Sequence, residues 1–248
     1  MLFEQPWIII GVVIAMMVGG FCKGASGISL ALVSVSLAAI FVDISTAVAL
    51  MTVPVLIANI WQVSSNAFVV ETWREYRPLY VAILPGVAFG AKVLTSVDPT
   101  LISGIVGVLV VAFAFLIYNQ PDWHLNPRTA RRIRIPVGLT GGVIAGISGL
   151  VPPVLIYMVA LKLPKERFIC AVGIGYLTAV LALIFFLSSY KFLTLQLLFW
   201  SAVASIPMFV GQLVGQGVRR YMDDSLFRMI ILILMIFSGA NLIRKAFY

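Results

Sequence analysis

Phe21-Cys22-Lys23-Gly24-Ala25-Ser26-Gly27-Ile28-Ser29 interrupts a run of residues, from 7 to 42, that is otherwise apolar. The interruption combines two glycines and two serines with a lysine that has no acid beside it. Within a bilayer, irregular backbone and charge are tolerated only where they are buried in protein or line a wet cavity. A related stretch, Ala145-Gly146-Ile147-Ser148-Gly149-Leu150-Val151-Pro152-Pro153, lies at an offset of 122, where Gly24 aligns with Gly146. The repetition predicts a duplicated chain with one break in each half.

The composition indicates a polytopic membrane protein. The 248 residues are 62% hydrophobic and 10% charged, and the mean hydropathy is +1.10, values typical of membrane rather than soluble proteins. The formal net charge is +8, but the basic residues lie in short clusters between apolar runs, which favours a role in membrane orientation over nucleic-acid binding. We therefore expect the lipid bilayer as the environment and no nucleic-acid partner.

Apolar runs bounded by charge, proline or glycine divide each half into five elements. They cover 7–21, 29–42, 44–68, 76–95 and 100–119, then 133–145, 153–162, 168–189, 192–217 and 226–244. Crossing the hydrocarbon core of ~30 Å takes ~20 helical residues, and the elements beside the two breaks are shorter than that. The pattern predicts an all-α fold in which each break is a re-entrant or broken helical hairpin, followed by three transmembrane helices.

The basic residues fall mainly on one side of this arrangement. Twelve lie in alternate connections and four in the others, with Lys23 left at a break; the twelve are Arg74, Arg77, Arg128, Arg131, Arg132, Arg134, Lys162, Lys165, Arg167, Arg219, Arg220 and Arg228. The positive-inside rule then puts the crowded side in the cytoplasm and both termini on the periplasmic side of the inner membrane. The halves have opposite orientations, with residues 1–121 as the first inverted repeat, 122–134 as a basic cytoplasmic linker and 135–248 as the second repeat.

Inverted repeats predict a binding site at the membrane midplane, where the two breaks meet. Helix ends at glycine-rich breaks expose N–H groups that favour an anion, and Lys23 has no acid in the interiors of the spans to neutralise it. The alternative is that the lysine reaches an interface and the glycines serve helix packing. The candidate substrate-binding residues at the breaks are Lys23, Gly24, Ser26, Gly27, Ser29, Gly146, Ser148, Gly149, Pro152 and Pro153.

Four further polar side chains are candidates within the spans. Asn59 and Gln62 are three residues apart and share a helix face, so they either line the substrate path or bond to a neighbouring helix. Tyr157 and Tyr176 either donate to substrate oxygens or pack as aromatics with satisfied hydroxyls.

The sequence argues against an enzyme. The only histidine is His124, so neither a helical H-E-x-x-H zinc site nor a serine activated by a histidine in the membrane can be built. The spans hold no carboxylate pair, and both cysteines lie in apolar surroundings, which gives no disulfide framework. We expect no catalytic residue, no metal and no cofactor.

With these features in place, the chain resembles the TauE/SafE family of sulfite and organosulfonate exporters over almost its whole length. The resemblance rests on Lys23-Gly24-Ala25-Ser26-Gly27, Asp43, Ala47-Val48, Pro54, Asn59 and Gln62 in the first half, and on Gly141-Gly142, Gly146, Ser148-Gly149, Pro152-Pro153, Tyr157, Leu163-Pro164-Lys165, Pro207, Gly211 and Gly215 in the second.

The resemblance implies a secondary transporter for a small sulfur-containing or organic anion, such as sulfite, sulfoacetate or a related sulfonate. Alternating access would carry the anion across the inner membrane. Two other functions stay open on the sequence, a passive anion channel and a non-transporting membrane scaffold subunit. The partners expected are the small anionic substrate and the bilayer; the oligomeric state is open, with a homodimer as one candidate.

Overall fold

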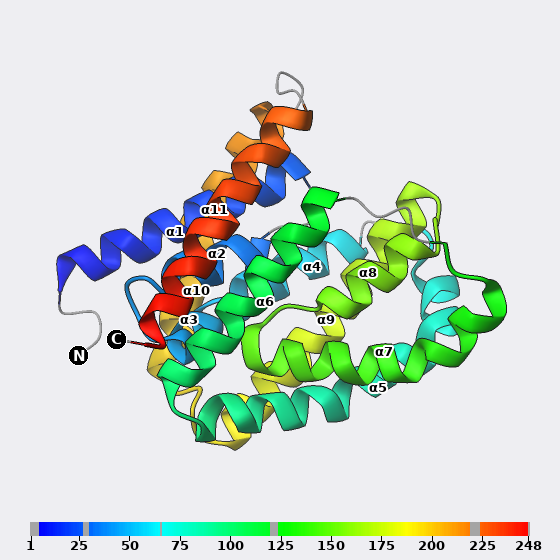
Figure 1. The fold of residues 1–248 in the computed structure, drawn as a ribbon, viewed down its shortest axis with the longest axis horizontal. Helices are drawn as coiled ribbons and strands as arrows, with labels where there is room; N and C mark the ends of the chain where they lie inside the picture. Colours follow the sequence, from blue (N-terminus) through cyan, green and yellow to red (C-terminus); the bar gives the residue numbers. More distant parts are fainter. Residues whose placement is uncertain (1–4, 27–29, 65, 120–123, 219–223, 248) are drawn as a thin grey trace. The chain divides into compact units, whose positions relative to one another are not determined.

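The structure is a computed structural model and describes residues 5–26, 30–64, 66–119, 124–218 and 224–247 (Figure 1). The described residues form helices joined by short connections, without a β-strand. The helices are α1 (Pro6–Ser26), α2 (Leu30–Ala38), α3 (Ile44–Leu50), α4 (Thr52–Ser64), α5 (Val69–Ser96), α6 (Pro99–Asn119), α7 (Pro127–Ser148), α8 (Pro152–Ala160), α9 (Lys165–Ser189), α10 (Leu195–Val218) and α11 (Asp224–Lys245). The expectation of an all-α polytopic membrane protein is confirmed.

Among the residues that the structure describes, six helical stretches are long and apolar enough to cross a membrane, namely Pro6–Ala25, Ile44–Ser64, Val69–Ser96, Pro99–Leu116, Lys165–Ser189 and Leu195–Val218. Five of them correspond to expected spans, and the stretch in α1 is added. The expected span 226–244 forms most of α11, parts of which lie outside the described residues.

The helices that lead into the two breaks are longer than expected. α1 has 21 residues and is apolar enough to cross ~30 Å of hydrocarbon, so the expectation that the element before the first break falls short is wrong. α7 has 22 residues, but its first turns carry four arginines and it is not among the six stretches. α7 begins at Pro127, inside the expected linker, because Asn126 caps it by accepting the N–H of Arg128 at 3.1 Å. The helices after the breaks are short, since α2 and α8 have nine residues each.

The element expected at 44–68 is two helices rather than one. α3 ends at Leu50 and α4 begins at Thr52, and the groups freed by this break are satisfied from α10. The Ser201 hydroxyl donates to the Leu50 carbonyl at 2.8 Å and accepts the Val53 N–H at 3.1 Å. Because the serine is 0% exposed, it replaces hydrogen bonds that water does not reach.

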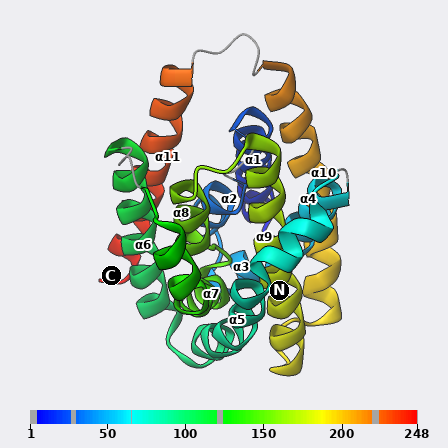
Figure 2. The same cartoon turned by 90° about the vertical axis from the view of Figure 1, so that its right-hand side faces the viewer.

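The chain divides into two compact units, each assembled from both halves of the sequence. Unit 1 comprises Met1–Pro54, Val97–Gln120 and Thr194–Tyr248, and unit 2 comprises Val55–Ser96 and Pro121–Leu193. In unit 1, α1 packs along α10, and α6 along α11. In unit 2, α5 packs along α7 and α9. Figures 1 and 2 show the α6–α11 pair and the α5–α7 pair, each lying side by side in both views.

The two units share one packing scheme. α1 and α7 end 122 residues apart, at Ser26 and Ser148, and α2 and α8 keep the same offset at both ends. In unit 2, α5 presents Gly90 to the Val143 carbonyl of α7, and in unit 1, α10 presents Gly215 to the Phe21 carbonyl of α1. A Cβ on either glycine would lie 2.2 Å from the carbonyl oxygen. The α1–α10 pair therefore corresponds to the α7–α5 pair.

Candidate functional site

The first break lies between the end of α1 and the start of α2, in unit 1. Lys23 is in the last turn of α1 and is 9% exposed. Gly24 follows it, and a Cβ there would lie 2.1 Å from the Gln212 carbonyl oxygen of α10, so α10 packs directly on the backbone at this level. Ser26 ends the helix, while Gly27 and Ser29, also predicted as site residues, lie outside the described residues.

The Lys23 ammonium is buried without a hydrogen bond or an ion pair to any described residue. The C-terminal end of α1 carries partial negative charge from its unpaired carbonyls, which favours a cation near the last turn. That contribution, typically 0.3–1 kcal/mol at a surface site, is smaller than the several kcal/mol needed to desolvate an ion. The end of α1 alone therefore does not account for the burial of this charge.

Gln212 is a polar residue near this break that the sequence analysis missed. Its Oε1 atom is buried and has no hydrogen-bond partner among the described residues. The residue belongs to α10, on the stretch that packs against Gly24. A signal was available, because Gln212 is an amide between two packing glycines, Gly211 and Gly215, in an apolar run.

The second break, in unit 2, is built differently. Ser148 ends α7 and Gly149 follows in the left-handed conformation, at φ 72°, which glycine adopts without a steric cost. The Ser148 hydroxyl donates to the Ile144 carbonyl at 2.8 Å and accepts the Leu150 N–H at 3.3 Å. The Gly149 N–H donates to Ala145 at 2.8 Å.

The donors next along the chain at the second break are few. Pro152 and Pro153, the first two residues of α8, have no N–H. The N–H groups of Gly149 and Leu150 are used inside the turn, so between Gly149 and Pro153 only the Val151 N–H is left as a donor for an anion. Tyr176, also predicted as a site residue, lies on α9 near Val151.

Gly146 serves packing on α5 rather than the turn itself. A Cβ on Gly146 would lie 2.5 Å from the Ala91 nitrogen of α5 and 2.7 Å from the Gly90 Cα. α7 and α5 therefore meet backbone to backbone one turn before the second break.

The remaining predicted residues are engaged elsewhere in unit 2. The Asn59 amide donates to the Val55 carbonyl of its own helix at 2.7 Å, and the Gln62 amide donates to the Ile169 carbonyl of α9 at 2.9 Å. Tyr157 lies near the start of α7, where its hydroxyl donates to the Ala130 carbonyl at 3.1 Å. These contacts use one N–H of each amide and the hydroxyl of the tyrosine.

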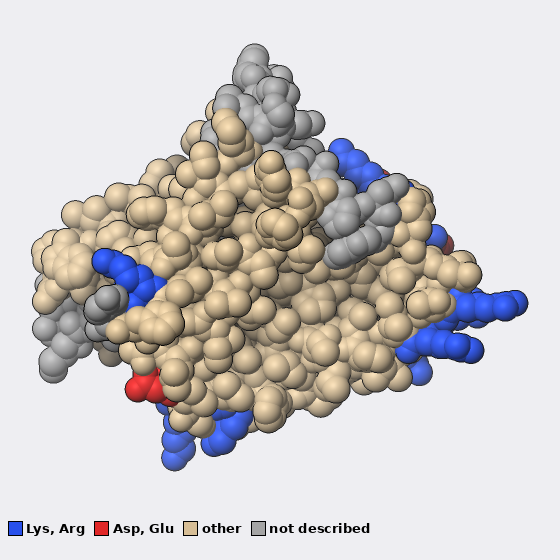
Figure 3. All heavy atoms as spheres, in the orientation of Figure 1, with Lys and Arg blue, Asp and Glu red and all other residues tan. Residues whose placement is uncertain are grey.

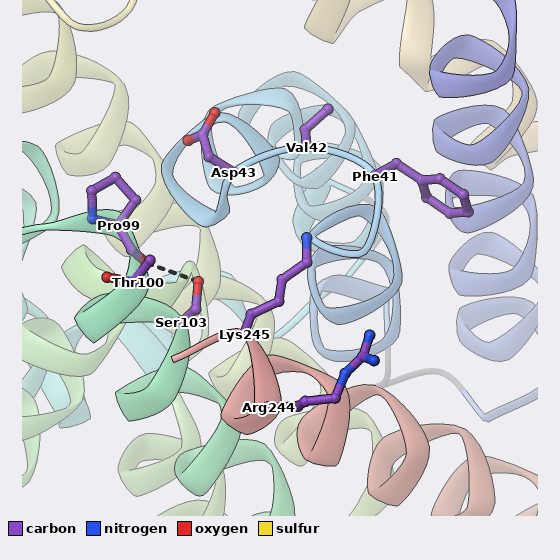
Figure 4. A pocket seen from close by; sticks show the side chains of 8 residues that line it. All are labelled: Phe41, Val42, Asp43, Pro99, Thr100, Ser103, Arg244 and Lys245. Atoms are coloured by element: carbon purple, nitrogen blue, oxygen red, sulfur yellow. Dashed lines mark hydrogen bonds between the residues drawn. The ribbon is translucent and has the colours of Figure 1, made fainter. Parts of the chain in front are cut away.

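A pocket of about 910 Å³ in unit 1 lies where the α2–α3 connection meets the start of α6 and the end of α11 (Figure 4). Its charged groups already have partners. Lys245 donates to the Ala39 and Ile40 carbonyls at 2.6 and 2.9 Å, and Asp43 accepts the Thr46 N–H at 2.8 Å as the cap of α3. The lysine therefore already satisfies carbonyls at the end of α2. Its positive charge is less available to an anion than that of Lys23, which has no partner among the described residues.

One comparison with known proteins decides the family. The model of the sulfite exporter TauE/SafE family matches residues 12–242. The chain belongs to the TauE/SafE family. A search of the curated proteins and a search of the solved structures each returned no match. The matched region contains both breaks and every site residue predicted from the sequence.

Membership in the family agrees with the apolar helices in placing the chain among polytopic membrane transporters. The described residues contain no group of three or more His, Cys, Asp or Glu side chains that could hold a metal ion.

Proposed function

We propose that the protein is a secondary transporter that moves a small sulfur-containing or organic anion across the inner membrane by alternating access. Sulfite, sulfoacetate and related sulfonates are the substrates that the family suggests. The observation that carries the proposal is Lys23, a buried ammonium in the last turn of α1 without a partner among the described residues.

The first break supplies the charge of the proposed site. Lys23 would bind the anion, with Ser26 three residues further along α1 and Gln212 on the stretch of α10 that packs against Gly24. The turn at Ser148 uses the Gly149 and Leu150 N–H groups internally, so it leaves an anion few donors. Asn59, Gln62 and Tyr176 stay proposed as lining of the path.

Alternating access would follow from the inverted repeat that we propose. The matched helix bounds and the matched glycine contacts of α1–α10 and α7–α5 support a duplication, and the distribution of basic residues supports opposite orientations with both termini in the periplasm. The left-handed Gly149 and the Pro152-Pro153 pair are the proposed hinges at the second break.

Transport into proteoliposomes tests the proposal. Lys23→Met keeps the length of the side chain and removes its charge, and Lys165→Ala, an exposed lysine at the start of α9, is the matched control. We expect saturable sulfite flux that internal sulfite accelerates in the parent and in Lys165→Ala, and no flux in Lys23→Met.

Anion binding gives a second readout that does not need transport. A ligand at 100 times its dissociation constant stabilises the folded state by ~2.7 kcal/mol, and Lys23→Met should lose this effect while remaining folded. Flux without saturation or trans-acceleration would instead indicate a channel. A parent protein with neither flux nor anion-dependent stabilisation would indicate a scaffold subunit.

A further inference from the structure

A basic pocket that the transport proposal does not use lies at the opposite end of α7 from the second break. Its volume is about 680 Å³, and it is formed by the start of α5, the start of α7 and the connection after α8, all in unit 2. Three arginines and three leucines carry the argument: Arg74, Arg131, Arg134, Leu125, Leu161 and Leu163.

Arg134 is held in place at the wall of this pocket. Its Nη1 donates to the Glu75 carbonyl at 2.8 Å and its Nε to the Tyr157 hydroxyl at 3.4 Å. The guanidinium lies over the Tyr76 ring, 5.2 Å from the centroid. A guanidinium fixed in this way loses little further freedom when it binds an anion.

The pocket has an excess of positive charge. Its one lining acid, Glu75, accepts a hydrogen bond from Arg167 at 3.2 Å, so its charge is already balanced from outside the pocket. Arg74 and Arg131 are exposed and form no ion pair with a described residue. Figure 3 shows Lys and Arg side chains gathered at the right-hand edge, over the end where α7 begins in Figure 1.

The walls between the arginines are apolar, and an exposed tryptophan precedes Arg74 in the chain. Trp73 of α5 is 39% exposed and stacks on Tyr80 with 5.5 Å between ring centroids, and exposed tryptophans concentrate at the interface between hydrocarbon and water. A soluble anion would need only the arginines. An anionic amphiphile would use the arginines and the leucines together.

We propose that this pocket binds the phosphate headgroup of an anionic phospholipid, with Arg74 and Arg131 on the phosphate beside the preorganised Arg134. Basic pockets between membrane helices near the cytoplasmic surface suit such headgroups. The assignment rests on the charge and the walls of the pocket, and it holds whether or not the chain transports an anion.

Two double variants of equal charge test it. Arg74→Gln with Arg131→Gln removes pocket charge, and Arg128→Gln with Arg132→Gln removes the same charge from exposed positions of α7 that do not line the pocket. Thermal unfolding in detergent is followed during titration with phosphatidylglycerol, phosphatidylcholine or inorganic phosphate. At about fivefold in affinity for each arginine, the pocket variant should bind phosphatidylglycerol roughly 30-fold more weakly, and the control should bind like the parent.

Three results would overturn the proposal. Equal weakening in both variants would indicate unspecific attraction to the basic end of unit 2. If phosphatidylglycerol stabilised the parent no more than phosphatidylcholine does, the pocket would not recognise an anionic headgroup. Stabilisation by inorganic phosphate as large as that by the lipid, and lost in the pocket variant, would assign the pocket to a soluble anion.

Discussion

Replacing Gly215 by alanine tests the packing that the two units share. The new Cβ would lie 2.2 Å from the Phe21 carbonyl oxygen and 3.0 Å from the Ala25 nitrogen. The favourable van der Waals distance between such non-bonded atoms is about 3.5 Å. Both neighbours are backbone, so no side chain can rotate away, and α1 and α10 must separate by roughly 1 Å. Overpacking usually costs about 1–3 kcal/mol, and we expect Gly215→Ala at the upper end.

Gly217→Ala, on the same helix, is the matched control, because a Cβ there would meet no described neighbouring atom within 4 Å. At ~3 kcal/mol, and about 2–4 °C for each kcal/mol in a chain of this size, Gly215→Ala should lower the unfolding midpoint in detergent by roughly 6–12 °C. The control should leave it within a degree or two. Gly90→Ala, the counterpart in unit 2, should match Gly215→Ala. Equal midpoints for Gly215→Ala and Gly217→Ala would refute the close crossing of α1 and α10.

Three further changes test local contacts. Ser201→Ala removes the side chain that satisfies both ends of the α3–α4 break, so it should cost about 2–3 kcal/mol in unfolding experiments; a loss below 0.5 kcal/mol would contradict that role. Tyr157→Phe should cost about 1 kcal/mol by leaving the Ala130 carbonyl without its donor and should keep anion-dependent stabilisation; loss of that stabilisation would place Tyr157 at the substrate. At the start of α6, the Thr100 hydroxyl and N–H donate to Asp98 and lower the pKa of its carboxyl. The stability gained from this carboxylate is present above its pKa in the unfolded chain and is lost as the pH falls through its lower pKa in the folded protein. Asp98→Asn should therefore flatten the acid side of a plot of melting temperature against pH. An unchanged plot would show that the Asp98 carboxylate does not stabilise the start of α6.

Much of the fold follows from local patterns. Two polar, glycine-rich breaks at a fixed offset predict paired hairpins, and long apolar runs predict helices. The start of α7 could also have been predicted, since Asn126-Pro127 is a typical N-cap and first-turn pair. The apolar run alone predicts a later start for α7, because the arginines in its first turns belong to the helix but are not apolar.

The break between α3 and α4 has a local signal in Pro54. Pro54 has no N–H to donate to the Leu50 carbonyl four residues earlier, and its ring would crowd that carbonyl in a continuous helix. The group that satisfies the freed backbone is Ser201, about 150 residues away, and no pattern within residues 44–68 predicts that contact.

The sequence identified the residue types of the candidate site but not how their hydrogen bonds are used. Glycine and serine at the second break suggested free donors, yet the Ala145 carbonyl and the Ser148 hydroxyl accept the Gly149 and Leu150 N–H groups. Lys23 was the more secure inference, because a lone charge in an apolar run needs a ligand or a path to water wherever the helices pack.

The pairing of α1 with α10 determines when this protein can finish folding during synthesis. Gly20 packs against the Met208 carbonyl, so roughly 190 residues must be added after α1 before its partner exists. At about 5–20 residues per second, that delay is on the order of 10–40 s. Until then α1 can pack only on helices made before α10, such as α2, and the glycine face that α10 covers stays open. The first helix therefore reaches its final packing only when the last fifth of the chain has been made.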